Sequence, residues 1–84
     1  MADLKGLIEA VARALADQPD AVSVRESERR GATVYELQVA SGDLGRVIGR
    51  QGRTAAALRT LLSSAAEEDD LRVSLDIRDQ TGRS

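Results

Sequence analysis

The residues with the most chemical content lie together in one short stretch, GRVIGRQGRT, at positions 45 to 54. Positions 49 to 52 read G-x-x-G, and glycine permits left-handed or crowded backbone conformations that a side chain would block. Phosphate oxygens accept hydrogen bonds from backbone N–H groups at helix starts and from guanidinium groups. The stretch therefore predicts a site for the backbone of a single-stranded nucleic acid. Four arginines and no acidic residue lie between positions 46 and 59: Arg46, Arg50, Arg53 and Arg59.

The composition argues against catalysis. The chain has no cysteine and no histidine, which removes disulfides, thiolate nucleophiles, imidazole bases and the common zinc ligand sets. No carboxylate pair has a setting that would tune it for acid and base work. Gly52-Arg53-Thr54 superficially suggests a nucleotide-binding P-loop, but that pattern needs a glycine at position 47 and a lysine at position 53, and a strand before it. We expect no enzyme, no catalytic residue, no metal and no cofactor.

Charge and hydropathy narrow the class of binding protein. The net charge of −2 argues against indiscriminate coating of nucleic acid, and an acidic run from Glu67 to Asp70 lies apart from the arginines. Tyr35 is the only aromatic residue, so stacking of bases on an aromatic platform is largely unavailable. No stretch approaches the roughly 18 apolar residues of a membrane span. We expect a cytoplasmic protein with no membrane partner.

Three segments have the patterns of helices. Apolar residues recur every three or four positions from Leu4 to Ala16, with Asp3 placed to cap this helix and Pro19 beyond its end. A short helical turn is expected from Asp43 to Ile48, and a longer helix from about Arg53 to Glu67. Alanine and serine surround much of the longer helix, which suits a helix that covers a sheet on one side and a partner on the other. The alternative is that the alanines simply make a stable helix. Its apolar face is expected to carry Leu58, Leu61, Leu62 and Ala65.

Three further segments have the patterns of strands. Val22 begins a strand that becomes polar before a turn at Gly31, and residues 33 to 39 alternate as a second strand with Tyr35 facing inward. Residues 71 to 77 alternate as a third strand, which follows a helical crossover and should lie parallel to one strand of the hairpin. The prediction is a two-layer α+β fold, in the order α-β-β-α-α-β, with a mixed three-stranded sheet covered by helices. We expect one domain over residues 1–84, with a core from about 4 to 78 and a flexible tail from 79 to 84.

The element order, together with VIGRQG between two helices, resembles a KH domain of the type II arrangement. Asp-Leu-Gly before this motif, Arg-Thr after it and the short length resemble the small bacterial single-KH proteins of the KhpA family, from Leu4 to Ile77. The resemblance implies that a G-x-x-G loop clamps about four nucleotides of single-stranded RNA. By position, Ile48 would line the groove, and Arg53 would contact a flanking phosphate. The complete set of RNA-binding residues expected is Arg46, Val47, Ile48, Gly49, Arg50, Gln51, Gly52 and Arg53.

The resemblance also implies partners and a cellular role. Proteins of this family are associated with homodimers, with heterodimers that include a larger Jag-type KH protein, and with pathways touching cell shape and division. An RNA chaperone or a post-transcriptional regulator is the role expected. The alternative is a protein-interaction adaptor with a KH shape and little or no RNA binding, which the acidic net charge and the scarcity of aromatic residues would suit.

Overall fold

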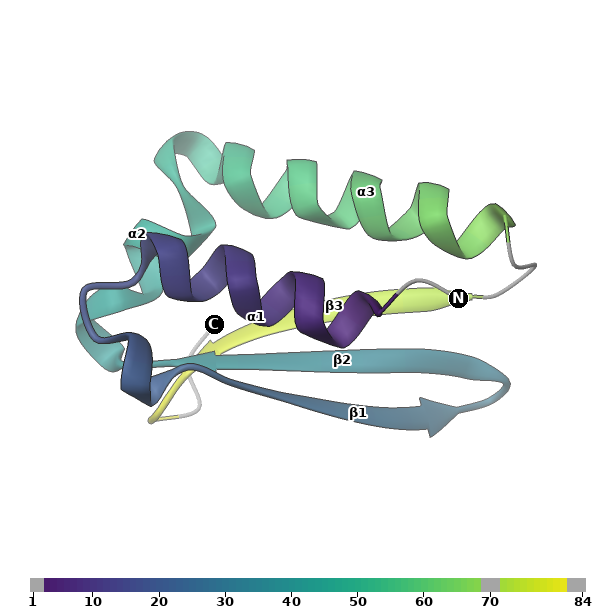
Figure 1. The fold of residues 1–84 in the computed structure, drawn as a ribbon, viewed down its shortest axis with the longest axis horizontal. Coiled ribbons are helices and arrows are strands. Elements are labelled where there is room, and N and C mark those ends of the chain that lie inside the picture. The colour runs from purple at the N-terminus through teal and green to yellow at the C-terminus, as the bar shows by residue number, and fades with distance from the viewer. Residues whose placement is uncertain (1–2, 69–71, 82–84) are drawn as a thin grey trace.

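The computed structural model describes residues 3–68 and 72–81, and Figure 1 shows their elements in two layers. The helices and strands follow the predicted order α-β-β-α-α-β, with short 3₁₀ turns between some of them. The helices are α1 (Leu4–Leu15), α2 (Leu44–Ile48) and α3 (Arg53–Glu68), and the strands are β1 (Ser23–Arg29), β2 (Ala32–Val39) and β3 (Val73–Asp79). The 3₁₀ turns are η1 (Pro19–Ala21), η2 (Ser41–Asp43) and η3 (Arg50–Gly52).

The sheet has the order β1-β2-β3 and is mixed, as predicted. Strands β1 and β2 are antiparallel and are joined by Arg30 and Gly31, whose φ angles of 52° and 79° are both positive. Two positive φ angles are what a tight hairpin turn needs to match the twist of its strands. Strands β2 and β3 are parallel, in a register that runs from Thr33 opposite Val73 to Val39 opposite Asp79. Strand β3 is therefore at the edge of the sheet, and one of its sides is unpaired within residues 3–68 and 72–81.

The helices cover one face of the sheet, as Figure 1 shows, and the core lies between the two layers. Helix α1 begins where the Asp3 carboxylate accepts a hydrogen bond of 2.9 Å from the Gly6 N–H, which confirms the predicted cap. Tyr35 is buried and faces the helices, also as predicted. None of the helices within the described residues has the length and apolar character needed to span a bilayer. The core is aliphatic apart from Tyr35 and includes Leu4, Ile8, Leu37, Val39, Val47, Leu58, Leu62, Leu75 and Ile77.

The prediction for Leu61 was wrong. This side chain is 55% exposed, whereas the neighbouring Leu62 is 1% exposed. A helix rotates by about 100° per residue, and the buried stripe follows Ala55, Leu58, Leu62 and Ala66. Leu61 lies at the flank of that stripe, so the sheet does not cover it.

The end of the chain also differs from the expectation. Strand β3 continues to Asp79, whose side chain is buried and accepts a hydrogen bond of 2.9 Å from the Thr81 backbone N–H. Asp79 thus belongs to the sheet and not to a flexible tail. The predicted start of the strand at Leu71, and residues 82–84 of the predicted tail, lie outside the described residues.

Candidate nucleic-acid interface

The G-x-x-G loop connects α2 to α3 at one end of the molecule, where the chain reverses direction above the sheet (Figure 1). The Gly49 N–H donates to the Gly45 carbonyl at 2.9 Å and ends α2, and the Gly52 N–H donates to the Gly49 carbonyl at 3.0 Å. The second hydrogen bond closes the loop on itself. Arg50 and Gln51, between the glycines, are exposed. The loop is therefore both fixed in shape and accessible to a ligand.

Each glycine of the loop is required for a different reason. Gly49 has φ 84° and ψ 168°, a combination that is essentially confined to glycine. A Cβ built on Gly49 would overlap the Thr54 hydroxyl and lie 3.0 Å from the Thr54 backbone nitrogen. Gly52 has φ 71°, but a Cβ there would meet no atom within 4 Å. Gly49 thus fits closely against the start of α3, whereas Gly52 leaves open space beside the loop.

Asp43, immediately before α2, links the start of this helix to the segment that follows α1. Its side chain is 2% exposed, and its Oδ2 accepts a hydrogen bond of 2.9 Å from the Gln18 backbone N–H. The other carboxylate oxygen lies 3.7 Å from Nε of Arg46. Sequence reasoning treated Asp43 as a helix-start charge and missed this contact. Nothing in the sequence connects Asp43 with a residue 25 positions away.

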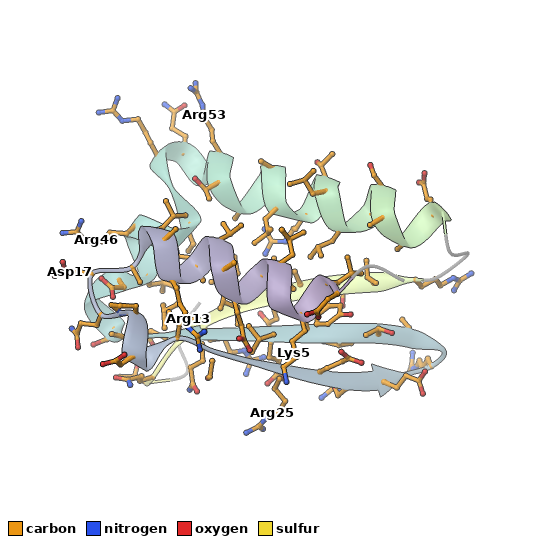
Figure 2. All side chains as sticks on the ribbon, viewed as in Figure 1. Lys5, Arg13, Asp17, Arg25, Arg46 and Arg53 are labelled. Carbon is orange, nitrogen blue, oxygen red and sulfur yellow. The ribbon has the colours of Figure 1, made fainter. Side chains whose placement is uncertain are left out.

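The structure brings some of the predicted site residues together and separates others. Arg50, Gln51 and Arg53 lie together at the loop, where the Arg53 Nη2 donates to the Gln51 Oε1 at 3.4 Å. Figure 2 shows the Arg53 side chain pointing away from the body of the molecule, while Arg46 points outward from α2 in another direction.

Val47 is a correction to the predicted set. It is 1% exposed and belongs to the core, because α2 must bury one face against the sheet and α3. We therefore remove it from the proposed contact surface. Its neighbour Ile48 is only half-buried and lines a pocket beside the loop.

A groove extends from the loop along the line where α3 faces β3. Its first pocket has a volume of about 300 Å³ and is lined by Ile48, Gly52, Ala55, Arg59, Asp76 and Ile77. A second pocket of about 230 Å³ follows, lined by Arg59, Leu62, Ser63, Val73, Ser74 and Leu75. Sequence reasoning missed the contribution of β3, since the spacing of residues in the chain does not say which strand lies beside α3. It placed Arg59 in the basic cluster but not in a groove.

The charges around the loop are suited to an anion. Arg50 and Arg53 carry no ion pair within residues 3–68 and 72–81. The groove is also lined by an acidic residue, Asp76, whose Oδ2 lies 2.7 Å from Nη2 of Arg78. The hydrogen bond that Arg78 donates to the Asp76 carboxylate, together with the negative charge of that carboxylate, raises the pKa of Arg78 above its ordinary value. In the described part of the chain, no group of three or more potential metal ligands occurs. The arrangement offers cations at the loop and, beside it, a groove whose lining mixes aliphatic with polar side chains.

Comparison with known proteins identifies relatives over most of the chain. The family model described as "KhpA/KhpB, KH domain" matches residues 5–77. A protein of Treponema pallidum named "RNA-binding protein KhpA" is 49% identical over 73 residues, which are 87% of this chain and 91% of that protein. Proteins of the same name from Halalkalibacterium halodurans and Chlamydia trachomatis are 47% and 40% identical, over 90% and 92% of this chain and 100% and 99% of their own lengths.

A solved structure supports the fold independently. The crystal structure of Era in complex with MgGDPNP and nucleotides 1506–1542 of 16S ribosomal RNA matches with a TM-score of 0.55. The match covers 90% of this chain and 29% of that chain, at 16% sequence identity. At that identity the similarity is one of fold.

Proposed function

This chain belongs to the KhpA/KhpB family of KH domains, and on that basis we propose that it binds single-stranded RNA by clamping the sugar-phosphate backbone on its G-x-x-G loop. Its curated relatives carry the name of an RNA-binding protein and not of an enzyme. The observation that carries the proposal is the loop between Gly49 and Gly52, which is exposed, fixed in shape and free of acidic side chains. About four nucleotides is the footprint that a KH loop of this size holds.

Phosphates and bases would occupy different parts of the site. Arg50 and Arg53 supply guanidinium donors for phosphate oxygens, and a phosphate can approach the Gly52 backbone because no Cβ stands there. The bases would lie in the groove beside α3, against the half-buried Ile48, in a pocket that the core residues Ala55 and Ile77 also line. Contact with aliphatic walls replaces the aromatic stacking that this chain lacks.

The test exchanges two exposed loop residues for carboxylates. In the double variant Arg50→Asp with Gln51→Asp, two negative charges would face the phosphates, so we expect loss of binding to a fluorescent single-stranded RNA octamer in anisotropy titrations. Arg29→Asp with Gln38→Asp is the matched control, since it exchanges the same residue types at exposed positions of β1 and β2. Unchanged affinity of the loop variant, with circular dichroism showing an intact fold, would refute the clamp.

Salt dependence gives a second readout on the unaltered protein. Two or three phosphate contacts predict a slope of about −1.4 to −2.1 in a plot of log affinity against log salt concentration. A wild-type protein with no salt-sensitive RNA binding would favour the adaptor function instead.

We also infer that the chain pairs with a second copy through the outer face of α3. Leu61 is 55% exposed there, and the small side chains of Ala57 and Ala65 lie one turn before and after it. Small neighbours allow a second helix to approach closely, and two modules on one RNA gain from effective concentration. A single four-nucleotide clamp is weak, so pairing would make the proposed binding useful.

Light scattering after size-exclusion chromatography tests the pairing. We expect Leu61→Lys to give a monomer, whereas Ala56→Lys, at an exposed position on another side of α3, leaves the dimer intact. A wild type that is monomeric at high concentration would refute self-pairing, and mixing it with a larger Jag-type KH protein would then test a heterodimer. RNA chaperoning or post-transcriptional regulation is the role that we attach to the binding, because a clamp without reacting groups acts on RNA by holding it.

A further inference from the structure

Arg59 occupies a special position in the groove. Its Nε and Nη2 donate to the Leu75 carbonyl at 3.4 and 3.3 Å, across the line between α3 and β3. In the parallel pairing of β2 with β3, the Arg72 carbonyl accepts from the Thr33 N–H, and backbone groups alternate in direction along a strand. The Leu75 carbonyl therefore points away from β2, toward the unpaired edge. Arg59 caps that edge from the helix.

The same side chain divides the groove into two compartments. It lines both the pocket beside the loop, with Ile48 and Ile77, and the next pocket, with Leu62 and Leu75. A base that enters either compartment from the loop would meet the Arg59 guanidinium. The loop residues Arg50 and Arg53 differ in this respect, because they line neither of these two pockets.

Two hydrogen bonds, of 3.4 and 3.3 Å, engage part of the Arg59 guanidinium with the Leu75 carbonyl. Arginine has five N–H donors in one plane and no acceptor. The Nε hydrogen and one hydrogen of Nη2 are directed at the Leu75 carbonyl, which leaves three of the five donors. Two of these three, one on Nη1 and one on Nη2, lie parallel to each other at the end of the guanidinium group. No ion pair engages Arg59 in the described part of the chain. Arg59 therefore keeps, beside the groove, a pair of parallel donors that the Leu75 carbonyl does not use.

Resting on the proposed function, we propose that Arg59 determines base specificity, by selecting guanine or cytosine at one position of the bound RNA. A parallel donor pair is matched by two adjacent acceptors on a base edge. Guanine offers O6 and N7, and cytosine offers O2 and N3. Adenine and uracil place a donor beside each acceptor on these edges, which would leave one arginine N–H facing another donor. A bidentate contact of this kind discriminates between bases by roughly 5- to 100-fold.

The experiment compares four RNA octamers by anisotropy. One contains only uracil, and the others carry a single guanine, cytosine or adenine in the middle of the same sequence. We expect the wild type to bind the guanine or the cytosine octamer roughly 5- to 100-fold more tightly than the other two. Which of the two it prefers identifies the base edge that is read. Equal affinity for all four octamers, or a preference for adenine or uracil, would overturn the proposal.

Two variants separate base selection from general affinity. Arg59→Lys keeps the charge but lacks the planar donor pair, so we expect it to bind all four octamers with similar affinity. Arg53→Lys is the control, and it should weaken binding to all four equally while the preference remains. If Arg59→Lys does not fold, as judged by circular dichroism, Arg59→Gln takes its place, again with loss of the guanine or cytosine preference expected. Retention of that preference in a folded Arg59 variant would contradict the proposal.

These outcomes also distinguish this inference from the proposed function. If the wild type binds RNA without base preference, the clamp stands and the role of Arg59 falls. If the wild type binds none of the octamers, the proposed function itself fails, and with it the role of Arg59.

Discussion

Gly49→Ala is the substitution whose cost the structure defines most sharply. The new Cβ would overlap the Thr54 hydroxyl, lie 2.8 Å from the Thr54 Cβ and lie 3.0 Å from its backbone nitrogen. The backbone strain of a non-glycine residue at φ 84° and ψ 168° costs about 1–3 kcal/mol, and crowding adds about 1 kcal/mol or more. We expect the free energy of unfolding to fall by about 3 kcal/mol, which is a large part of the stability of a small domain.

Gly52→Ala is the matched control. Its φ of 71° is also left-handed, but the added methyl group would have open space around it. The left-handed conformation alone costs an alanine about 1–2 kcal/mol. Urea unfolding, followed by far-ultraviolet circular dichroism, measures both variants against the wild type. Equal losses of stability in the two variants would refute the packing of Gly49 on Thr54.

A double variant separates the two contributions at Gly49. Thr54→Ala removes the hydroxyl that the new Cβ would overlap, but it leaves the backbone nitrogen of residue 54 and the strained φ unchanged. We therefore expect Thr54→Ala to recover part of the loss caused by Gly49→Ala, and not all of it. Additive effects of the two substitutions would show that the side chains do not interact.

Three further predictions concern the core that supports the site. In urea titrations of dilute protein, Leu62→Ala should lower the free energy of unfolding by about 2–5 kcal/mol, whereas Leu61→Ala should change it by about 0.5 kcal/mol or less. Similar losses in the two variants would contradict the assignment of Leu62 to the buried face and Leu61 to the exposed face. Asp43→Ala should lower the free energy of unfolding by about 1–3 kcal/mol, because the Gln18 N–H loses its acceptor. Asp43→Asn keeps an acceptor oxygen and should lower it less in the same titration. Equal losses in the two variants would argue against that hydrogen bond. Burial, and after it the charges of Glu26 and Asp3, raises the pKa of Tyr35 above 10.0. The protonated phenol therefore stabilises the folded state below pH 10.0, and this contribution to the free energy of unfolding is lost as the pH rises through the folded pKa. Near-ultraviolet absorbance should titrate later in the folded protein than in urea, and coincident curves would contradict the burial of Tyr35.

The distribution of charge explains how an acidic chain can hold an anion at one place. The net charge is −2, yet Arg50 and Arg53 lie at the loop without an acidic partner in the described residues. Nearby charges dominate an electrostatic field in salt solution, because screening limits its range to about 10 Å. Acidic residues elsewhere on the protein would reduce nonspecific binding to nucleic acid without cancelling the positive charge at the loop. The proposed site is therefore local, which agrees with a short footprint on RNA.

The sequence by itself determined the elements and the loop. The period of three to four in α1, the alternation in β2 and the cap at Asp3 are local signals, because they depend on neighbours within a few positions. The glycines at 49 and 52 with their arginines are also local, and they carried the family resemblance that the match over residues 5–77 confirmed.

Only the tertiary structure decided which of these residues are buried and which line the groove. Val47 and Ile48 are adjacent and equally apolar, yet the packing of α2 buries the first and leaves the second beside the groove. Leu61 and Leu62 are separated in the same way by the line along which α3 meets the sheet. Arg59 faces the Leu75 carbonyl because the parallel crossover places β3 beside α3. The two residues are 16 positions apart, and no local pattern in the sequence indicates that they are in contact. Burial and groove contacts depend on where distant segments meet, which is a property of the assembled layers and not of neighbouring residues.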